Sequence, residues 1–565
     1  MRIFWKLGCA ASLIAGLGFA QGGAELPNLT EITVQPRVGI LGQTKMSLSE
    51  VIERVLKNDR DIEISRILRN EAAFNISGAQ GAFDPVAGIR AYDSKTTTPI
   101  ASLIGGAPNG QLIQKELYGA PQLSGIIPWT GGSYTTTFTN SRQTSNSTFL
   151  TVNPQYPTAL RLDFTQPLWR GLRFDDNRYR LQVARKDLRL SQEQLRQRTI
   201  DVVTQAIDAY WELVYASQAY DVQREAVRLA EQQFASNRRQ AEAGILAPID
   251  VVAAQTQVAT FQQSLFQAQQ ALTQAENNLK SMILPNRGDL LWATALIPET
   301  QPETQVALPA LNQAMDQALA GRPELSQSIV NLEINALDRR RSAENAKPRV
   351  DAFATVTTNG LAGIPLPPGP NPFTAGFAPI VGYLNQLGAL SGLAPLPPVN
   401  FGGGGGSVPP VFVGSYGQSI SNLISGGFPT AQVGVQVSFP LRNRTAEAQE
   451  AVSAAEGKRL QAVREQVEMA IETDVRNSMQ AVTSAQARLQ AATLASRTAE
   501  QQYESEERQL QAGTSTVFLV LQRQSDLISA RSREVRARAD VAESIANFDR
   551  ATAHTLQTYN IRLQP

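Results

Sequence analysis

The sequence predicts an internally duplicated α+β membrane protein. In this fold several chains share one β-barrel, which is continued by a long antiparallel α-helical coiled coil. Three observations predict it. The order of segments along the chain occurs twice, very long heptad-patterned helices are each broken once by Ala-Gly, and short segments alternate apolar and polar residues.

The first element is a predicted secretory signal peptide over residues 1–20. A positively charged start precedes an apolar run over residues 7–19, and small residues suited to cleavage follow. The single cysteine, Cys9, lies in this run, so the mature chain has no thiol chemistry. An N-terminal extension over residues 21–46 comes next, and no later run is long and apolar enough for an ordinary transmembrane helix.

Charge and composition exclude several classes of function. Lys and Arg number 51 against 50 Asp and Glu, so there is no electrostatic case for a nucleic-acid partner. The one histidine, His554, has no cysteine beside it, so no zinc or copper site is predicted and no cofactor is expected. Phosphate-binding loops and nucleophile-base motifs are absent from the sequence. We therefore expect a protein that is not an enzyme.

Internal duplication sets the expected domains. Pro85 and Pro348 are 263 residues apart, and Gly244 and Gly513 are 269 apart, within otherwise similar segment orders. The domains expected after the extension are a first repeat over 47–283, a linker over 284–306, a second repeat over 307–556 and a C-terminal tail over 557–565.

Each repeat is expected to hold a helix, then a strand, a loop and a strand, then a long helical hairpin. The first helices are expected at 47–80 and 307–346, the strand-loop-strand segments at 81–169 and 349–440, and the hairpins at 174–283 and 442–556. Apolar or small residues recur at alternating steps of three and four from Val251 to Met282 and from Ile471 to Tyr503, which is coiled-coil spacing.

Each hairpin is predicted to turn at its Ala-Gly, near Gly244 and near Gly513. Glycine readily takes the positive φ that ends a helix, and Pro248 suits the first residue of a returning helix. The two Ala-Gly breaks therefore mark the far ends of two antiparallel hairpins.

Short segments between the helices are predicted strands. Residues 160–168 and 431–439 alternate apolar with polar side chains, and stretches near 83–93, 132–140 and 349–358 do so more weakly. Such alternation suits a membrane barrel strand, although a strand of a soluble sandwich has the same pattern. The duplicated plan supplies about four principal strands, whereas barrels close with about eight or more. Several chains must then share a barrel, with twelve strands from three chains or eight from two.

The segment over 359–429 is an unusual loop, rich in Gly, Pro and apolar residues. No charged residue or histidine occurs from Ala352 to Leu441. A loop of this length is either passive or functional. Our hypothesis is that it restricts the barrel mouth, so deletion of residues 361–427 should raise single-channel conductance.

At this point the chain resembles the TolC-like outer-membrane efflux family over residues 45–558. The motifs that carry the resemblance are GAFDPV with ENAKPRV, FTQPLWRG with VSFPLRNR, AYWELVYA, and the tips AGILAPIDVV and AGTSTVFLV. The resemblance implies a homotrimer with a twelve-stranded barrel in the outer-membrane lipid, continued by a periplasmic tunnel of twelve helices. It also implies a periplasmic adaptor, or membrane fusion protein, that couples the tips to an inner-membrane pump.

The resemblance also places candidate site residues at the hairpin tips. The positions that would contact the adaptor are Ala243, Gly244, Ile245, Ala512, Gly513 and Thr514. The periplasmic entrance positions are Asp250, Ser515, Leu519 and Gln522. The last three replace an Arg and two Asp of the family pattern, so the charged gate is missing there. Leu519 could form a hydrophobic constriction or could pack within the coil.

The implied function is a passive exit duct of a tripartite efflux or type I secretion system in the cell outer membrane. The alternative is a structural periplasmic coiled-coil protein that tethers envelope layers without conducting. A self-contained porin fits poorly with about four strands per chain. The scattered methionines and single histidine disfavour metal cargo, which leaves drugs, lipids and polypeptides as substrate classes.

Overall fold

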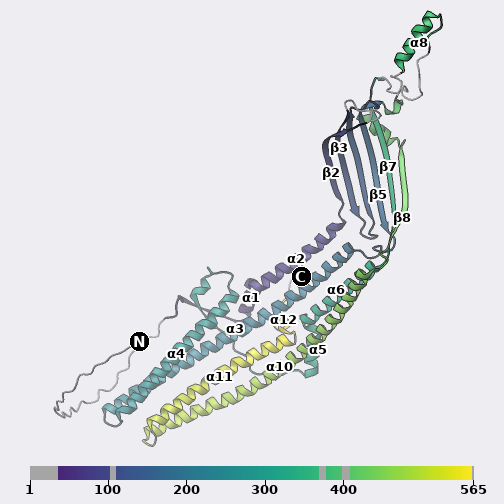
Figure 1. Ribbon diagram of the computed structural model, residues 1–565. Coiled ribbons are helices and arrows are strands. Elements are labelled where there is room, and N and C mark those ends of the chain that lie inside the picture. Colours follow the sequence, from purple (N-terminus) through teal and green to yellow (C-terminus); the bar gives the residue numbers. More distant parts are fainter. Residues whose placement is uncertain (1–35, 102–109, 368–376, 397–407, 563–565) are drawn as a thin grey trace, which may run out of the picture. The chain divides into compact units, whose positions relative to one another are not determined.

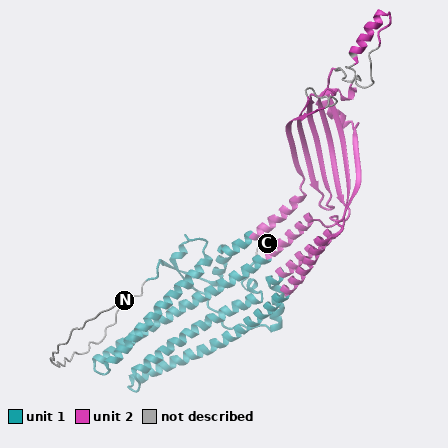
Figure 2. Ribbon diagram, viewed as in Figure 1, with its two compact units in different colours: residues 1–67, 193–326, 465–565 teal, residues 68–192, 327–464 magenta. Residues whose placement is uncertain are grey.

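We describe a computed structural model that covers residues 36–101, 110–367, 377–396 and 408–562. Two compact units divide the chain (Figure 2). Unit 1 comprises residues 1–67, 193–326 and 465–565, and unit 2 comprises residues 68–192 and 327–464. The predicted signal peptide and the first part of the predicted extension lie outside the described residues.

Long helices, each followed by a returning helix, dominate the structure (Figure 1). They are α3 (Asp176–Glu242) with α4 (Pro248–Ile283), and α10 (Arg444–Gln511) with α11 (Val517–Ala551). With 67 residues, α3 is about 100 Å long at about 1.5 Å per residue. The expected fold of long antiparallel helices plus strands is confirmed.

The heptad seams lie inside these hairpins. On α4, Val251, Val258 and Leu265 are buried and join one apolar cluster with Phe234 of α3. On α10, Ala485 and Leu489 pack with residues of α11. A repeat of 3.5 residues keeps one stripe facing the partner helix along the whole hairpin, which explains the burial.

The two shorter leading helices differ from expectation, because each is divided in two. Residues 47–80 form α1 (Leu48–Asn58) and α2 (Arg60–Gln80), and residues 307–346 form α5 (Leu311–Gly321) and α6 (Pro323–Ala346). The dividing residues, Asp59 and Arg322, are extended and 263 positions apart. At the first break, the Asp59 carboxylate accepts hydrogen bonds from the backbone N–H groups of Asp61 and Ile62. At the second break, Pro323 disfavours a helical conformation of the residue before it, Arg322.

A small parallel sheet, which the sequence did not predict, joins the predicted extension to the predicted linker. Strand β1 (Gly42–Met46) pairs with β6 (Thr294–Pro298), which follows the 3-10 turn η4 (Leu290–Ala293). Tyr210 of α3 donates from its hydroxyl to the Met46 carbonyl at 3.2 Å and accepts from the Thr300 N–H at 3.0 Å. One buried phenol therefore fixes both segments against the long helix.

Unit 2 contains an antiparallel sheet of six strands (Figure 1). In spatial order they are β2 (Val86–Pro99), β3 (Gln111–Ile126), β4 (Ser133–Ser145), β5 (Val152–Pro167), β7 (Arg349–Pro365) and β8 (Pro429–Ser438). The expected count of about four is therefore too low, and residues 81–169 hold four strands rather than two. Strand β3 escaped prediction because adjacent apolar pairs and the charged pair Lys115–Glu116 obscure its alternation.

The uncharged loop is shorter than expected, because residues 359–365 belong to β7. Its described helices are α8 (Ala378–Leu390) and α9 (Tyr416–Ile424), with the turn η5 (Pro410–Phe412) before α9. The hydroxyls of Ser419 on α9 and Thr158 on β5 lie 2.9 Å apart. A Cβ at Gly360 would lie 2.2 Å from the Ser419 carbonyl, so glycine permits this approach.

Helix α9 lies on the side of the sheet that carries Leu160 and Leu162, since Thr158 shares their face. That face is the apolar one, so α9 does not lie over the polar face. The hypothesis that the loop restricts a pore stays a prediction for the remainder of the segment. The short helix α12 (Thr555–Thr558) ends the described secondary structure.

Candidate site at the hairpin tips

Both hairpins turn through the same backbone geometry. Gly244 and Gly513 each have φ of 75°. The N–H of Ile245 donates to the Gln240 carbonyl at 2.9 Å, and the N–H of Thr514 donates to the Gln509 carbonyl at 2.9 Å. This is the helix-ending pattern in which a left-handed residue satisfies carbonyls that the last turn leaves free.

The returning helices start in different ways. Pro248 is the first residue of α4 and needs no hydrogen-bond partner there. Thr516 caps α11 by accepting from the Leu519 N–H through its hydroxyl. The tips are thus alike where they end the outgoing helix and distinct where they begin the return.

The six predicted tip residues are all exposed in the described chain: Ala243, Gly244, Ile245, Ala512, Gly513 and Thr514. Large apolar side chains accompany them. Ile245 is 75% exposed, Ile249 69% and Phe518 70%. Ile249 and Phe518 were not predicted; the signal in the sequence was an apolar residue next to a tip and outside the heptad seam. Each tip therefore presents apolar surface at the end of a hairpin, as a protein-binding site would.

The predicted entrance positions lie near the starts of the returning helices: Asp250 and Leu519 in the first turns, Gln522 in the second turn of α11, and Ser515 just before its N-cap. Asp250 is half-buried on α4, and the Ser515 hydroxyl donates to Glu506. Leu519 is 39% exposed, so within the chain it is not packed in the seam. Gln522 is exposed and donates to an Asp526 carboxylate oxygen at 3.1 Å.

Sequence comparison with the family pattern missed Asp526. Leu519, Gln522 and Asp526 are spaced by three and four residues, so they lie on one face of α11. Asp526 also pairs with Arg523, at 3.4 Å. We call this face, with Leu519, Gln522 and Asp526, the entrance stripe. It therefore carries a charged group one turn beyond Gln522.

A larger ionic cluster joins α3 to α11. Arg536 lies 2.5 Å from Glu212, 2.7 Å from Asp540 and 3.2 Å from Glu543, and its guanidinium stacks over Tyr215. Burial raises the pKa of Glu543 to about 7, against the lowering effect of Arg536. These groups hold the two hairpins together and are not grouped as metal ligands; among the described residues no such group of three His, Cys, Asp or Glu occurs.

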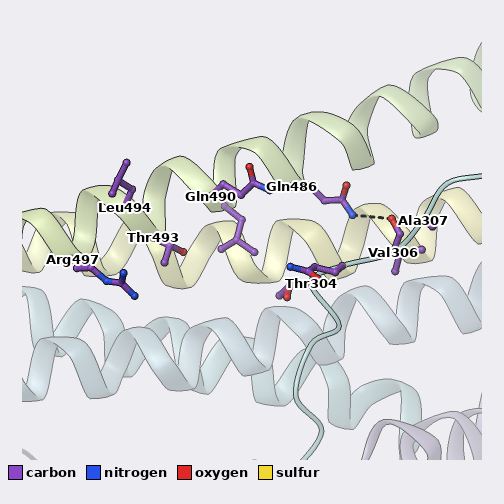
Figure 3. A pocket seen from close by; sticks show the side chains of 10 residues that line it. Thr304, Val306, Ala307, Gln486, Gln490, Thr493, Leu494 and Arg497 are labelled. Atoms are coloured by element: carbon purple, nitrogen blue, oxygen red, sulfur yellow. Dashed lines mark hydrogen bonds between the residues drawn. The ribbon is translucent and has the colours of Figure 1, made fainter.

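An open groove lies between α10 and the extended segment that follows β6 (Figure 3). Its volume is about 730 Å³, and its lining includes Thr304, Gln490, Thr493 and Arg497. The Gln486 side-chain amide donates to the Val306 carbonyl at 3.2 Å and anchors the segment. Polar and apolar side chains line this open groove together, and its lining residues include no Asp, Glu, His or Cys.

A family model described as outer membrane efflux protein matches residues 134–283 and 394–554, which together exceed half of the chain. The chain belongs to this family. No significant match was found among curated proteins. Across the described residues, no helix is both long and apolar enough to cross a membrane.

Solved structures share the fold of this outer membrane efflux protein. The outer-membrane channel OprN matches with a TM-score of 0.61 at 15% identity, covering 90% of this chain and 89% of that one. VceC of Vibrio cholerae matches at 0.58 and 14%, covering 90% and 96%, and the CmeC channel of Campylobacter jejuni at 0.59 and 12%, covering 94% of both. The chain is an outer membrane efflux protein with the fold of solved outer-membrane channels, and its family is not one of enzymes.

Proposed function

We propose that three copies of this chain form one passive exit duct across the outer membrane, coupled through a periplasmic adaptor to an inner-membrane pump. The observation that carries the proposal is the open sheet of unit 2. One of its faces exposes large apolar side chains, and β2 and β8 each have one free edge among the described strands. Lipid does not tolerate open edges, so other copies must cover them.

Exposed apolar residues on two helices support assembly through the helical part as well. On α2 they are Ile64, Ile67, Leu68 and Phe74, and on α10 they are Val452, Met469 and Leu494. Apolar stripes of this kind favour burial against neighbouring helices. The choice of three copies rests on the family resemblance.

The hairpin tips are the proposed adaptor contact. Ile245 in the first tip and Phe518 at the start of α11 are exposed apolar side chains, and a few anchors of this kind contribute most of the free energy at protein interfaces. In this proposal the duct is passive, and the partner pump supplies the energy.

Mass and conductance test the duct. The purified mature chain should have the mass of three chains in detergent and should give steady conductance in a planar bilayer. A monomer that stays in solution without detergent would contradict the proposal. A trimer without conductance would favour the structural tether instead.

Adaptor contact is tested by tip variants. Ile245→Asp and Phe518→Asp should each weaken binding of an adaptor encoded beside this protein by tenfold or more, or about 1.4 kcal/mol. Leu290→Asp is the control, because Leu290 is 86% exposed in η4 and belongs to no tip. Bilayer conductance should be unchanged in all three variants. Equal adaptor affinity for tip and control variants would reject the tips as the contact.

A further inference from the structure

The six strands of unit 2 form one continuous two-faced wall. The register gives a polar row across all strands: Gly88, Gln122, Thr137, Arg161, Thr357 and Thr430. The adjacent row is mostly apolar: Ala87, Leu123, Thr136, Leu162, Val356 and Ala431. Because side chains alternate along every strand, these rows define two faces that persist from β2 to β8.

Exposure follows the same division. Large exposed apolar side chains on the apolar face include Ile89, Leu117, Leu123, Leu160, Leu162, Val356, Val433, Val435 and Val437. They come from β2, β3, β5, β7 and β8. On the polar face the exposed large hydrophobic residues are Val86 and Tyr92 among the described strands. An apolar outer face with a polar inner face is the arrangement of a membrane barrel wall.

The β3–β4 hairpin takes part in the polar face as fully as the other four strands do. Glu116 of β3 accepts from the Gln143 amide of β4 at 2.9 Å and from the Tyr92 hydroxyl of β2 at 3.2 Å. On the far side, the Thr139 hydroxyl of β4 donates to the Ala159 carbonyl of β5 at 3.3 Å. Side-chain bonds therefore cross the polar face on both sides of the hairpin, so the hairpin is part of the wall rather than an appendage.

Strand directions determine how copies can join. All five pairings in the sheet are antiparallel, so β2 and β8, at its two ends, run in opposite directions. A β2 edge can then pair antiparallel with a β8 edge of the next copy, and the pairing can be repeated around a ring. Because the hairpin adds two strands, it lengthens the wall without changing this alternation.

We propose that the free edge of β2 binds the free edge of β8 of a second copy, and that three copies with six strands each close a barrel of eighteen strands. This inference rests on the proposed trimer and departs from the twelve strands that the resemblance implied. Barrel diameter grows roughly linearly with strand number, so the pore in the membrane would be about 1.5-fold wider than a twelve-stranded one.

Adjacent threonines of β4 give a matched test. Thr136 pairs with Leu162 on the apolar face, and Thr137 pairs with Arg161 on the polar face. The sequence has one cysteine, Cys9, so the variants are made in a Cys9→Ser background and each carries a single cysteine. In the full-length protein in liposomes, Thr137→Cys should react with a charged, water-soluble maleimide. Thr136→Cys should react at least tenfold more slowly, and a bimane on it should be quenched by spin-labelled lipid tails.

Cysteine variants of two adjacent residues on β8, Val435 and Gln436, test the proposed channel independently of the β3–β4 hairpin. Val435→Cys should be lipid-exposed and Gln436→Cys water-exposed if the sheet forms any membrane barrel. The same contrast on β8 with equal labelling of Thr136→Cys and Thr137→Cys would overturn the placement of the hairpin alone. No contrast on either strand would reject the proposed channel itself.

Strand number is measured directly by cryo-electron microscopy of the purified trimer. Eighteen strands in cross-section, with β2 beside β8 of the next copy, are expected. A conducting trimer with twelve strands would refute the inference and leave the proposed function intact. A twelve-stranded dimer, with six strands from each chain, would instead refute the trimer.

Discussion

Gly244 and Gly513 lie 269 positions apart and share a φ of 75°, each at the turn of a helical hairpin. In neither case would a Cβ meet another atom within 4 Å. The requirement for glycine is therefore conformational rather than steric. The two hairpins of the duplicated chain therefore reverse direction through the same glycine conformation.

Alanine at either tip should strain the turn. An alanine in the left-handed region costs about 1 kcal/mol, so Gly244→Ala and Gly513→Ala should speed proteolytic cleavage at the tips about fivefold. Gly78→Ala is the control, because Gly78 lies within α2, has open space around its Cα and lacks a positive φ. That control should stabilise the protein by about 0.5–1 kcal/mol. Slower cleavage in the tip variants would contradict the explanation.

Loss of the Lys280 ammonium should destabilise unit 1. Lys280 is fully buried, lies 2.6 Å from Glu276 and donates to the carbonyls of Trp292 and Thr294 at 3.2 and 2.6 Å. Lys280→Met would leave those carbonyls unpaired and Glu276 with Arg37 as its remaining ionic partner, which should cost about 3 kcal/mol.

Thermal unfolding of the purified assembly measures this loss. The surface pair of Lys45 and Glu299, at 3.1 Å with Lys45 72% exposed, supplies the control. Lys45→Met should cost less than about 1 kcal/mol. Similar melting temperatures for the two variants would show that the buried pair contributes little.

Stability should depend on pH through Glu543. The unfolded chain ionises this group near its ordinary pKa of 4.5, whereas burial raises the folded pKa to about 7. Between these values the folded state binds more protons, so the free energy of unfolding falls as pH rises. Glu543→Gln removes that fall, so its melting temperature should exceed that of the natural protein most at pH 8.

Glu225 provides a control of opposite sign. A hydrogen bond from Arg228 holds the pKa of Glu225 below its usual range. The ionised Glu225 therefore stabilises the folded chain above the ordinary pKa of the group, and this stabilisation is lost on acidification. Glu225→Gln should lower the melting temperature slightly at neutral pH and not at pH 3. If Glu543→Gln also lowers the melting temperature at neutral pH, burial is not the main influence on the pKa of Glu543.

A carboxylate at Leu519 should alter the entrance. In the proposed trimer, Leu519→Asp would place three carboxylates on the stripe that already carries Asp526. Block by a trivalent cation added on the periplasmic side should then strengthen at least tenfold, because clustered like charges attract counter-ions. Asp526→Asn should weaken block, and Leu290→Asp should not change it. Unaltered leakage and cation block in Leu519→Asp would remove any gating role for this residue.

Local patterns in the sequence were sufficient for the helices, their seams and their turns. A heptad repeat and an Ala-Gly break act through neighbouring residues, so the stripe around Val258 and the turn at Gly244 could be predicted directly. The breaks at Asp59 and Arg322 were also encoded locally, by an Asp before a helix start and by Pro323, but the continuous apolar pattern on either side concealed them.

The tertiary structure alone decided the width of the sheet and the placement of its parts. Strand β3 has a weak alternation, and it becomes a strand because β2 and β4 satisfy its backbone on both sides. The hydrogen bond from Tyr210 to the Met46 carbonyl, and the packing of Ser419 against Thr158, likewise needed coordinates. Such contacts join residues whose proximity no local pattern records, because the backbone hydrogen bonds and packing that create it are formed only in the folded chain.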